Sequence, residues 1–240
     1  MKIVIADDLP ESALALLRAE PDWQVDARSG RSPADLAAAL ADADALMVRS
    51  ATKVTAAVIA SAPRLRIVAR AGTGVDNVDV GAASGRGILV VNAPGANSIS
   101  VAEHACALML ALARMVPAAD RAMKDGKWEK KRFLGTEVRG KTLGIAGLGR
   151  IGQEVGHRAR AFGMRVVAHD PFISSEIAAD MGVELLTLDE VCQTADFLTL
   201  HLPSTAETKH LFNDARFAVT KPGIRIINTA RGELIDEAAL

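Results

Sequence analysis

Three glycines and a downstream carboxylate have the spacing of a dinucleotide site. Residues 147–152 read Gly-Leu-Gly-Arg-Ile-Gly and lie between a strand-like run and a helix-like run. This spacing suits a tight turn at Gly147, close approach of the backbone to a pyrophosphate at Gly149, and close helix packing at Gly152. Asp170, about 20 positions further on, can accept hydrogen bonds from a ribose. Its charge would repel a 2′-phosphate, so NAD is the expected cofactor, while the neighbouring basic residues keep NADP open.

An arginine follows the last predicted strand. Residues 227–232 read Ile-Asn-Thr-Ala-Arg-Gly, which places Arg231 at the carboxyl edge of a sheet. Open α/β sheets bind their ligands at that edge. A guanidinium there can hold a carboxylate through two parallel hydrogen bonds and orient a neighbouring carbinol or carbonyl. A surface arginine in a turn is the alternative interpretation.

Two further arginines end predicted strands in the first half of the chain. Arg49 and Arg70 reach one sheet edge, with Lys53 one loop away. These cations exceed what a single carboxylate needs, and they suit a phosphate, with Gly72 and Gly74 offering backbone N–H groups. An ordinary salt bridge remains the alternative for each arginine.

The elements that would position these residues alternate between short β-branched runs and Ala/Leu-rich stretches. This alternation is typical of a parallel sheet covered by helices on both faces, and it occurs twice. We expect an α/β protein with two doubly wound lobes, residues 1–97 and 98–240. The predicted strands are Lys2–Ala6, Trp23–Ala27, Ala45–Val48, Arg66–Ala69 and Ile88–Val91, then Thr142–Ala146, Arg165–His169, Glu184–Leu186, Asp196–Leu200 and Ile224–Asn228.

A long helix is expected from Ser98 to Ala119, bridging the lobes. Its predicted apolar side carries Val101, Ala105, Leu108, Met109 and Leu112. Residues 123–140, rich in Lys and Gly, lose this periodicity and are expected to form a surface arm or a plain linker. Ser32 and Pro33 predict the start of an earlier helix.

Composition excludes several classes of partner. The chain has 28 Lys+Arg against 29 Asp+Glu, a formal net charge of −1, with no basic face for nucleic acid or a membrane surface. Cys106 and Cys192 do not form a spaced framework, so reduced thiols and no metal or disulfide scaffold are expected. Without a signal-peptide core or a membrane-length apolar run, a cytoplasmic protein is expected.

Five stretches resemble the D-isomer-specific 2-hydroxyacid dehydrogenase family. They are RSATKVTAAVI (49–59), RAGTGVDNVDV (70–80), MKDGKWEKK (123–131), KTLGIAGLGRIGQEVG (141–156) and INTARGELIDEAAL (227–240). The resemblance implies a flavodoxin-like substrate domain over residues 1–97 and a Rossmann NAD-binding domain over 98–240, incomplete at its C-terminus. It implies cofactor contacts at Thr73, Arg150, Ile151, Asp170, Leu202, Pro203, Thr229 and Ala230, a catalytic Arg231, and substrate contacts at Arg49, Arg70 and Asn97. Leu202 stands where many relatives have Thr, which retains a main-chain contact but not a hydroxyl contact.

The resemblance also implies an activity. It is the NAD-dependent oxidation of a small phosphorylated 2-hydroxy acid, 3-phosphoglycerate, by a homodimer or homotetramer built on the NAD domain. In this family the base that takes the hydroxyl proton is a His tuned by a Glu, and both are expected beyond Leu240. We therefore expect a truncated reading frame, with weak NAD binding and no turnover. Among the histidines present, His201 is the remaining candidate for a substitute base, because it ends a strand on the cofactor side.

Other functions remain open. A glyoxylate, glycerate or lactate-type relative would use the same fold, and a non-catalytic NAD-sensing dimeric scaffold would need no base. A phosphorelay receiver is excluded, because Arg49 stands where its phosphoacceptor Asp would follow the third strand, although Asp7 and Asp8 follow the first.

Overall fold

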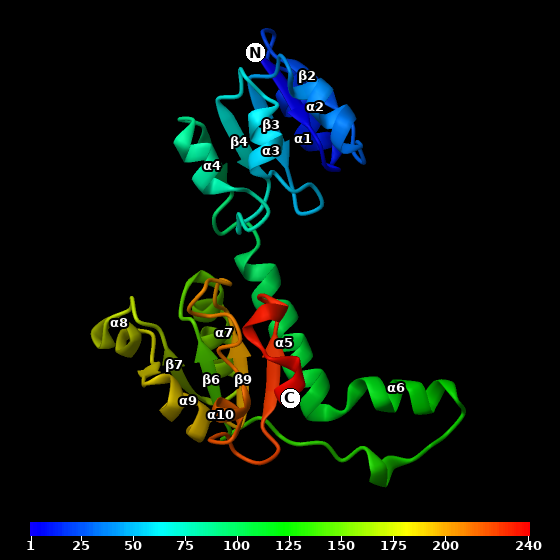
Figure 1. Cartoon of the computed structure of the whole chain (residues 1–240). Helices are drawn as coiled ribbons and strands as arrows, with labels where there is room; N and C mark the ends of the chain where they lie inside the picture. The colour runs from blue at the N-terminus through cyan, green and yellow to red at the C-terminus, as the bar shows by residue number, and fades with distance from the viewer. The chain divides into compact units, whose positions relative to one another are not determined.

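A computed structural model describes residues 1–240, and the chain divides into two compact units (Figure 1). Unit 1 is Met1–Asn97 and unit 2 is Ser98–Leu240. Each unit contains one five-stranded parallel sheet with its own hydrophobic core. The expected α/β class with two doubly wound sheets is confirmed.

The sheet of unit 1 has the strand order β2-β1-β3-β4-β5. The chain runs from β1 to β2 at one edge and then returns to β3 on the other side of β1. The order therefore reverses between β1 and β3, which makes this the topological switch point of a flavodoxin-like sheet. The strands are β1 (Lys2–Ile5), β2 (Gln24–Ala27), β3 (Ala45–Val48), β4 (Ile67–Arg70) and β5 (Leu89–Asn92).

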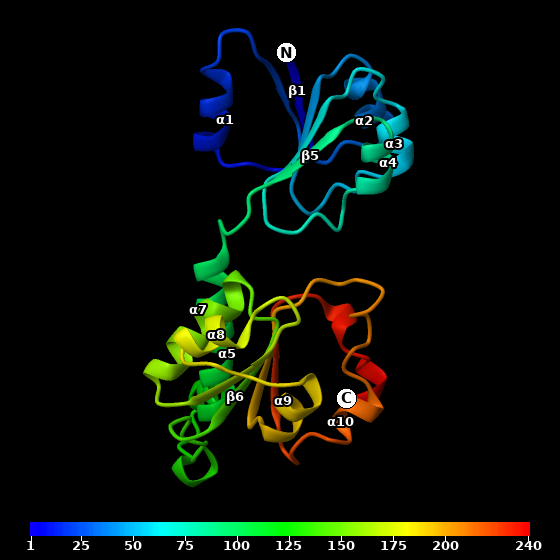
Figure 2. The ribbon, with the colours of Figure 1, turned by 90° about the vertical axis from the view of Figure 1, so that its left-hand side faces the viewer.

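Helices cover the two faces of this sheet unequally. Figure 2 shows α1 (Glu11–Arg18) on one face and α2 (Pro33–Leu40), α3 (Ala56–Ala60) and α4 (Val80–Gly85) on the other. Leu40, Leu46 and Ile59 are fully buried between the three helices and the sheet. The predicted start of α2 is confirmed, because the Ser32 hydroxyl accepts a hydrogen bond from the Asp35 N–H at 3.1 Å and Pro33 is the first helical residue.

The sheet of unit 2 has the order β10-β9-β6-β7-β8, which is the Rossmann arrangement. Its switch point lies between β6 and β9. Both strands are buried throughout, as expected for a sheet covered on both faces. The strands are β6 (Thr142–Ala146), β7 (Arg165–His169), β8 (Glu184–Leu185), β9 (Phe197–Leu200) and β10 (Arg225–Asn228).

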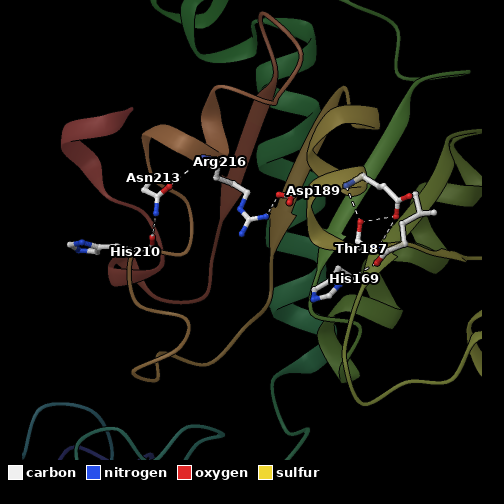
Figure 3. A network of polar contacts seen from close by, with 8 residues as sticks. His169, Thr187, Asp189, His210, Asn213 and Arg216 are labelled. Atoms are coloured by element: carbon white, nitrogen blue, oxygen red, sulfur yellow. Dashed lines mark hydrogen bonds and ion pairs between the residues drawn. The ribbon is translucent and has the colours of Figure 1, made fainter.

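Five helices pack on the two faces of this second sheet. One face carries α5 (Ser98–Arg114), α7 (Arg150–Ala161) and α8 (Ser175–Asp180), and the other carries α9 (Leu188–Thr194) and α10 (Asp214–Phe217) (Figure 2). A glycine at 144 lets α9 approach β6, because a Cβ there would lie 2.8 Å from a methyl of Val191. Arg216 of α10 donates to Asp189 of α9, which joins the two helices (Figure 3).

The long helix expected from Ser98 to Ala119 is broken. Met115 takes a left-handed φ of 55°, and α6 (Val116–Lys124) leaves at 66° to α5. Pro117 lies in the first turn of α6, where a residue without an N–H is tolerated. The predicted apolar side was wrong at Leu108 and Leu112, which are 37% and 49% exposed. The side of α5 buried in the core consists of small residues and one methionine: Ala102, Ala105, Cys106, Met109 and Ala113.

The segment after α6 returns to the end of α5. After the 3₁₀ turn η1 (Lys130–Arg132), Gly135 adopts a φ of 65° and the Thr136 N–H donates to the Ala113 carbonyl at 2.7 Å. A Cβ at Gly135 would lie 2.7 Å from that same carbonyl oxygen, so the close return requires glycine. No one helix of the chain is both long and apolar enough to cross a membrane; α5 and α6 meet that criterion only together, as a bent pair.

Candidate functional site

The glycine turn lies at the switch point of unit 2, directly after β6. Gly147 has a φ of 93°, and a Cβ there would lie 2.7 Å from the His201 carbonyl oxygen after β9. A Cβ at Gly152 would lie 2.2 Å from the Gly147 carbonyl oxygen. By contrast, a Cβ at Gly149 would meet nothing within 4 Å. The protein's own packing therefore requires glycine at 147 and 152, whereas at 149 the missing side chain leaves open space.

The N-terminus of α7 faces this turn. Gly149 is the N-cap, and no side chain caps the helix. Arg150 and Ile151, both predicted cofactor contacts, are its first two residues. Because the N–H groups of a first turn have no partner within the helix and carry the positive end of its dipole, this end suits an anionic diphosphate.

Asp170 lies against the same turn. Its Oδ2 accepts a hydrogen bond from the Leu148 N–H at 2.8 Å, and its Oδ1 accepts one from the Phe172 N–H at 2.9 Å. The Gly147 N–H donates to the His169 carbonyl at 2.9 Å. Carboxylate oxygens accept more than one hydrogen bond each, so Asp170 retains capacity for ribose hydroxyls.

His169, which precedes Asp170, has a structural contact of its own. Its Nδ1 lies 3.1 Å from the Leu186 carbonyl oxygen (Figure 3). The ring is thus engaged by the next stretch of chain, which fits the structural role expected from the sequence. His210 likewise acts through its backbone: it has a φ of 50°, and its carbonyl accepts from the Asn213 side chain.

The carboxyl end of β9 brings His201 and Leu202 beside the turn. The His201 Nε2 lies 2.9 Å from the Thr199 hydroxyl, and burial lowers the pKa of this imidazole to about 4. A Leu202 methyl would be 3.0 Å from a Cβ at Gly147. The Pro203 carbonyl accepts from the Thr208 hydroxyl at 2.6 Å. At neutral pH His201 is uncharged with one ring nitrogen engaged, so it is a poor general base.

The loop after β10 carries a buried hydroxyl that lacks a partner. The Thr229 Oγ1 makes no hydrogen bond although it is buried. Buried hydroxyls are normally paired, so an unpaired one needs a specific explanation, and a bound molecule would supply the missing partner. Together with the open space at Gly149 and the acceptor at Asp170, it shows that the residues present fit a bound dinucleotide.

Asn228 folds this loop and was missed by the sequence analysis. Its side chain donates to the Arg231 carbonyl at 2.9 Å and accepts from the Ala230 N–H at 3.0 Å. The guanidinium of Arg231 donates to the Ala230 carbonyl at 2.9 Å and is partly buried. Arg231 therefore stands at the carboxyl edge of the sheet in a loop of defined shape, as predicted. The sequence signal that could have identified Asn228 is its residue type, because Asn at the end of a strand commonly folds a tight turn through its side chain.

Unit 1 presents its cations at the carboxyl ends of adjacent strands. Arg49 follows β3 and is exposed, and Arg70 is the last residue of β4, paired in register with Val48. A Cβ at Gly72 would lie 1.9 Å from the Arg70 guanidinium, so glycine makes room for that side chain. The Gly72 N–H donates to the Arg70 carbonyl at 2.8 Å and is thus engaged within its own turn.

Two predicted contacts lie together in unit 1. The Thr73 hydroxyl donates to Asn97 Oδ1 at 2.7 Å, and the Thr73 carbonyl accepts from the Asn92 side chain at 2.5 Å. Gly74 belongs to the same loop. Thr73, a predicted cofactor contact, is thus hydrogen-bonded to Asn97, a predicted substrate contact.

The arrangement in unit 2 defines a class. A Rossmann-order sheet with an open glycine turn at its switch point and an acid after the second strand is an NAD-binding domain of the dehydrogenase type. Residues 106–240 match the family model described as "D-isomer specific 2-hydroxyacid dehydrogenase, NAD binding domain". The chain belongs to the D-isomer-specific 2-hydroxyacid dehydrogenase family, as the motifs indicate, and NAD is its cofactor.

Curated relatives and solved structures agree with this assignment. The chain is 54% identical over 240 residues to the D-3-phosphoglycerate dehydrogenase of Mycobacterium tuberculosis H37Rv and 51% identical over 239 residues to that of Rattus norvegicus. These matches include 99% and 100% of this chain, respectively, but the chain spans only 45% of the length of each relative. The crystal structure of the Aquifex aeolicus D-lactate dehydrogenase complexed with NAD and lactic acid matches with a TM-score of 0.90 and 29% identity, covering 99% of this chain and 71% of that one.

Proposed function

We propose that the protein carrying this chain oxidises D-3-phosphoglycerate to 3-phosphohydroxypyruvate with NAD, the first step of serine biosynthesis. The observation that carries the proposal is the open glycine turn beside Asp170 and the orphaned Thr229 hydroxyl. The identity to D-3-phosphoglycerate dehydrogenases across the whole chain supports the choice of substrate. In this proposal unit 2 is the NAD-binding domain and unit 1 the substrate domain.

Arg231 is the proposed catalytic residue of the chain. Its guanidinium would hold the substrate carboxylate and orient the adjacent carbinol. Hydrogen bonds to charged groups contribute about 1.5–3 kcal/mol each, enough to favour one orientation strongly. Bound NAD supplies the acceptor for the hydride of the carbinol carbon. We assign the proton-abstracting base to no residue between 1 and 240, since the His201 Nε2 is occupied by Thr199.

Unit 1 is proposed to hold the phosphate. Arg49, Lys53 and Arg70 place three cations after adjacent strands, and a phosphate carries about two negative charges at neutral pH. Asn97 and the loop of Gly72 and Gly74 lie within the same unit. A lactate-type substrate would leave these cations without a ligand charge, which favours the phosphorylated acid.

The activity is tested by the reverse reaction in the protein that carries this chain. NADH consumption is compared with 3-phosphohydroxypyruvate, hydroxypyruvate, pyruvate and glyoxylate. We expect kcat/KM to be at least tenfold higher for the phosphorylated substrate, and Arg49→Ala to raise KM for that substrate alone. A preference for pyruvate or glyoxylate would establish a lactate- or glyoxylate-type enzyme. Tight NADH binding with no turnover of any of them would support a cofactor-sensing scaffold.

A homodimer or homotetramer through unit 2 is part of the proposal. Several large apolar side chains on α5, α6 and the returning segment are exposed, among them Leu112 (49%), Val116 (53%), Trp128 (72%) and Leu134 (77%). Exposed apolar groups of this extent commonly mark an interaction surface. Light scattering should give a multiple of 25.2 kDa for the 240-residue chain, and Trp128→Ala with Leu134→Ser should shift it toward the monomer.

A further inference from the structure

A buried carboxylate bridges the switch point of unit 1. Asp7 follows β1 and is 7% exposed, although it is charged and no role follows from the dehydrogenase motifs. Its Oδ2 accepts from the Arg49 N–H at 2.6 Å, and its Oδ1 accepts from the Thr52 hydroxyl at 2.5 Å. The Thr52 N–H lies within 3.1–3.2 Å of both oxygens. One side chain thus binds both ends of the loop that carries Arg49.

A second side chain holds the same loop by its carbonyls. The Asn77 Nδ2 donates to the Arg49 carbonyl at 2.8 Å and to the Thr52 carbonyl at 2.7 Å. Arg70 Nε also approaches the Arg49 carbonyl, at 3.3 Å. The backbone of Asn77 is itself fixed, because its carbonyl accepts from the Val54 N–H at 2.7 Å.

The N–H and C=O groups of Arg49 and Thr52 are all engaged by Asp7 and Asn77. A loop residue would otherwise place its amide in water, where its conformation is free. Burial opposes ionisation of Asp7, but the hydrogen bonds from the Thr52 hydroxyl and from backbone N–H groups outweigh it and lower the pKa of this carboxyl. Asp7 therefore holds the loop as a charged acceptor at neutral pH, and charge-assisted hydrogen bonds are about twice as strong as neutral ones.

We propose that Asp7 and Asn77 are positioning residues, which fix the Arg49 loop so that the exposed guanidinium is held ready for the anionic group of the substrate. This inference rests on the proposed function, because it takes Arg49 as a phosphate contact. Preorganisation raises affinity by removing the ordering cost from the binding step. Neither residue needs to touch the substrate.

If Asp7 acted only through its charge, replacing it would strengthen substrate binding rather than weaken it. Removing a negative charge near a cationic site should tighten the binding of an anion. Asp7→Asn and Asp8→Asn each remove one charge. Asp8 is exposed, and it contacts Arg49 through its backbone carbonyl, which accepts from the guanidinium at 3.3 Å and is retained in Asp8→Asn. The proposal therefore requires Asp7→Asn to weaken anion binding while Asp8→Asn leaves it unchanged or slightly tighter.

The test measures 3-phosphoglycerate affinity and amide hydrogen exchange by NMR on the 240-residue chain. We expect Asp7→Asn and Asn77→Ala to weaken binding at least fivefold and to speed exchange of the Arg49 and Thr52 amides at least tenfold. NADH affinity should stay within twofold. Thr52→Val should give a smaller loss and Thr52→Ser should restore wild-type binding. These milder variants keep the test valid if Asp7→Asn does not fold.

Three results would overturn the inference, and they differ in what else they affect. If Arg49→Ala weakens 3-phosphoglycerate binding but Asp7→Asn does not, Arg49 is a ligand that needs no positioning, and the proposed function stands. If Arg49→Ala changes nothing, both the positioning role and the phosphate contact are wrong. Exchange of the Arg49 and Thr52 amides that is equally fast in wild type and Asp7→Asn would also reject the proposal.

Discussion

In both sheets of this chain the strand order reverses beside the first strand, but the residues at the two switch points differ. In unit 1 the carboxylate of Asp7, after β1, reaches across to the loop after β3. In unit 2 the corresponding strands, β6 and β9, are followed by a glycine turn and an uncharged histidine, and Gly149 leaves open space. The switch point of unit 1 is thus bridged by hydrogen bonds to the Asp7 carboxylate, whereas that of unit 2 leaves space in which a ligand can lie.

This difference indicates how one architecture can serve two purposes. A dinucleotide needs bare backbone and helix N–H groups, so unit 2 removes side chains from its switch point. In unit 1 the switch point is instead filled by hydrogen bonds from Asp7, and Arg49 is exposed, as the proposed binding of a small anion would require. Four measurements test this difference between the two units.

The largest effect is expected where glycine is required by packing. Gly147→Ala would force a left-handed φ on a side chain and press its Cβ against the His201 carbonyl. We expect the free energy of unfolding of unit 2 to fall by about 3 kcal/mol, combining about 1–2 for the backbone with about 1–3 for the overlap. Thermal and denaturant unfolding measure it.

Two other glycine substitutions separate the cost of the left-handed backbone from the cost of the atomic overlap. Gly30→Ala in unit 1 has a similar φ of 67° but meets nothing within 4 Å, so it should cost about 1 kcal/mol. Gly149→Ala should cost about 1 kcal/mol or less, as loss of a favourable N-cap. It should nevertheless weaken NADH binding at least tenfold. Unchanged NADH affinity in Gly149→Ala would contradict the placement of the diphosphate.

Acid should loosen unit 2 before unit 1. The pKa of His201 falls from 6.5 to about 4 on folding, so its contribution to stability is complete above pH 6.5 and is lost as pH decreases toward 4. The shift corresponds to about 3 kcal/mol. The pKa of Asp7 is lowered from 3.8, so its contribution disappears only below that pH. Hydrogen exchange of β9 and β1 amides at several pH values distinguishes the two units.

A matched pair of variants checks the assignment of the acid effect. His201→Asn should remove the loss of stability between pH 6.5 and 4, whereas His210→Asn, at an exposed position, should keep it. If the acid dependence of β9 is the same in wild type and His201→Asn, the histidine does not titrate as proposed.

The preference for NAD over NADP is expected to be a smaller free-energy effect than the two changes in stability. NADH should bind about tenfold more tightly than NADPH, about 1.4 kcal/mol, because Asp170 repels a 2′-phosphate. Asp170→Ala should narrow the ratio, while Glu176→Gln, which removes an exposed acid from α8, should not. Tighter binding of NADPH by the unmodified chain in a calorimetric titration would refute the preference.

The smallest effect concerns the orphaned hydroxyl. Thr229→Val preserves the shape but removes a buried oxygen without a partner, so the free protein should be unchanged or stabilised by up to about 1 kcal/mol. NADH affinity should decrease by about threefold or more, and Thr229→Ser should retain it. A variant that loses stability without losing affinity would mean that the hydroxyl serves the fold rather than the cofactor.

The sequence predicts much of this molecule because its strands are buried and regular. The ranges Ala45–Val48, Thr142–Ala146 and Arg165–His169 match the structure residue for residue. The glycine turn, Asp170 and Arg231 follow from chemistry that requires fixed residue types at fixed spacing. Other strand ends differ by one residue, where pairing rather than composition sets the limit.

Long-range contacts could not be predicted in the same way. Asp7, Thr52 and Asn77 lie together only because the strand order places the ends of β1, β3 and β4 side by side, and no local sequence pattern indicates that. The break at Met115 was missed because apolar periodicity continues through it, although Pro117 was a signal. Leu108 and Leu112 were misplaced because apolar spacing identifies a helix face without indicating whether anything covers it.

The return of Thr136 to the Ala113 carbonyl gives residues 114–135 an independence that the rest of unit 2 lacks. This excursion leaves and rejoins the domain at a single point, so insertions or deletions within it alter no strand register. Doubling the length of such a loop costs only about 0.6 kcal/mol of closure entropy. Changes in the length of this excursion therefore need not move the strands that position the cofactor turn.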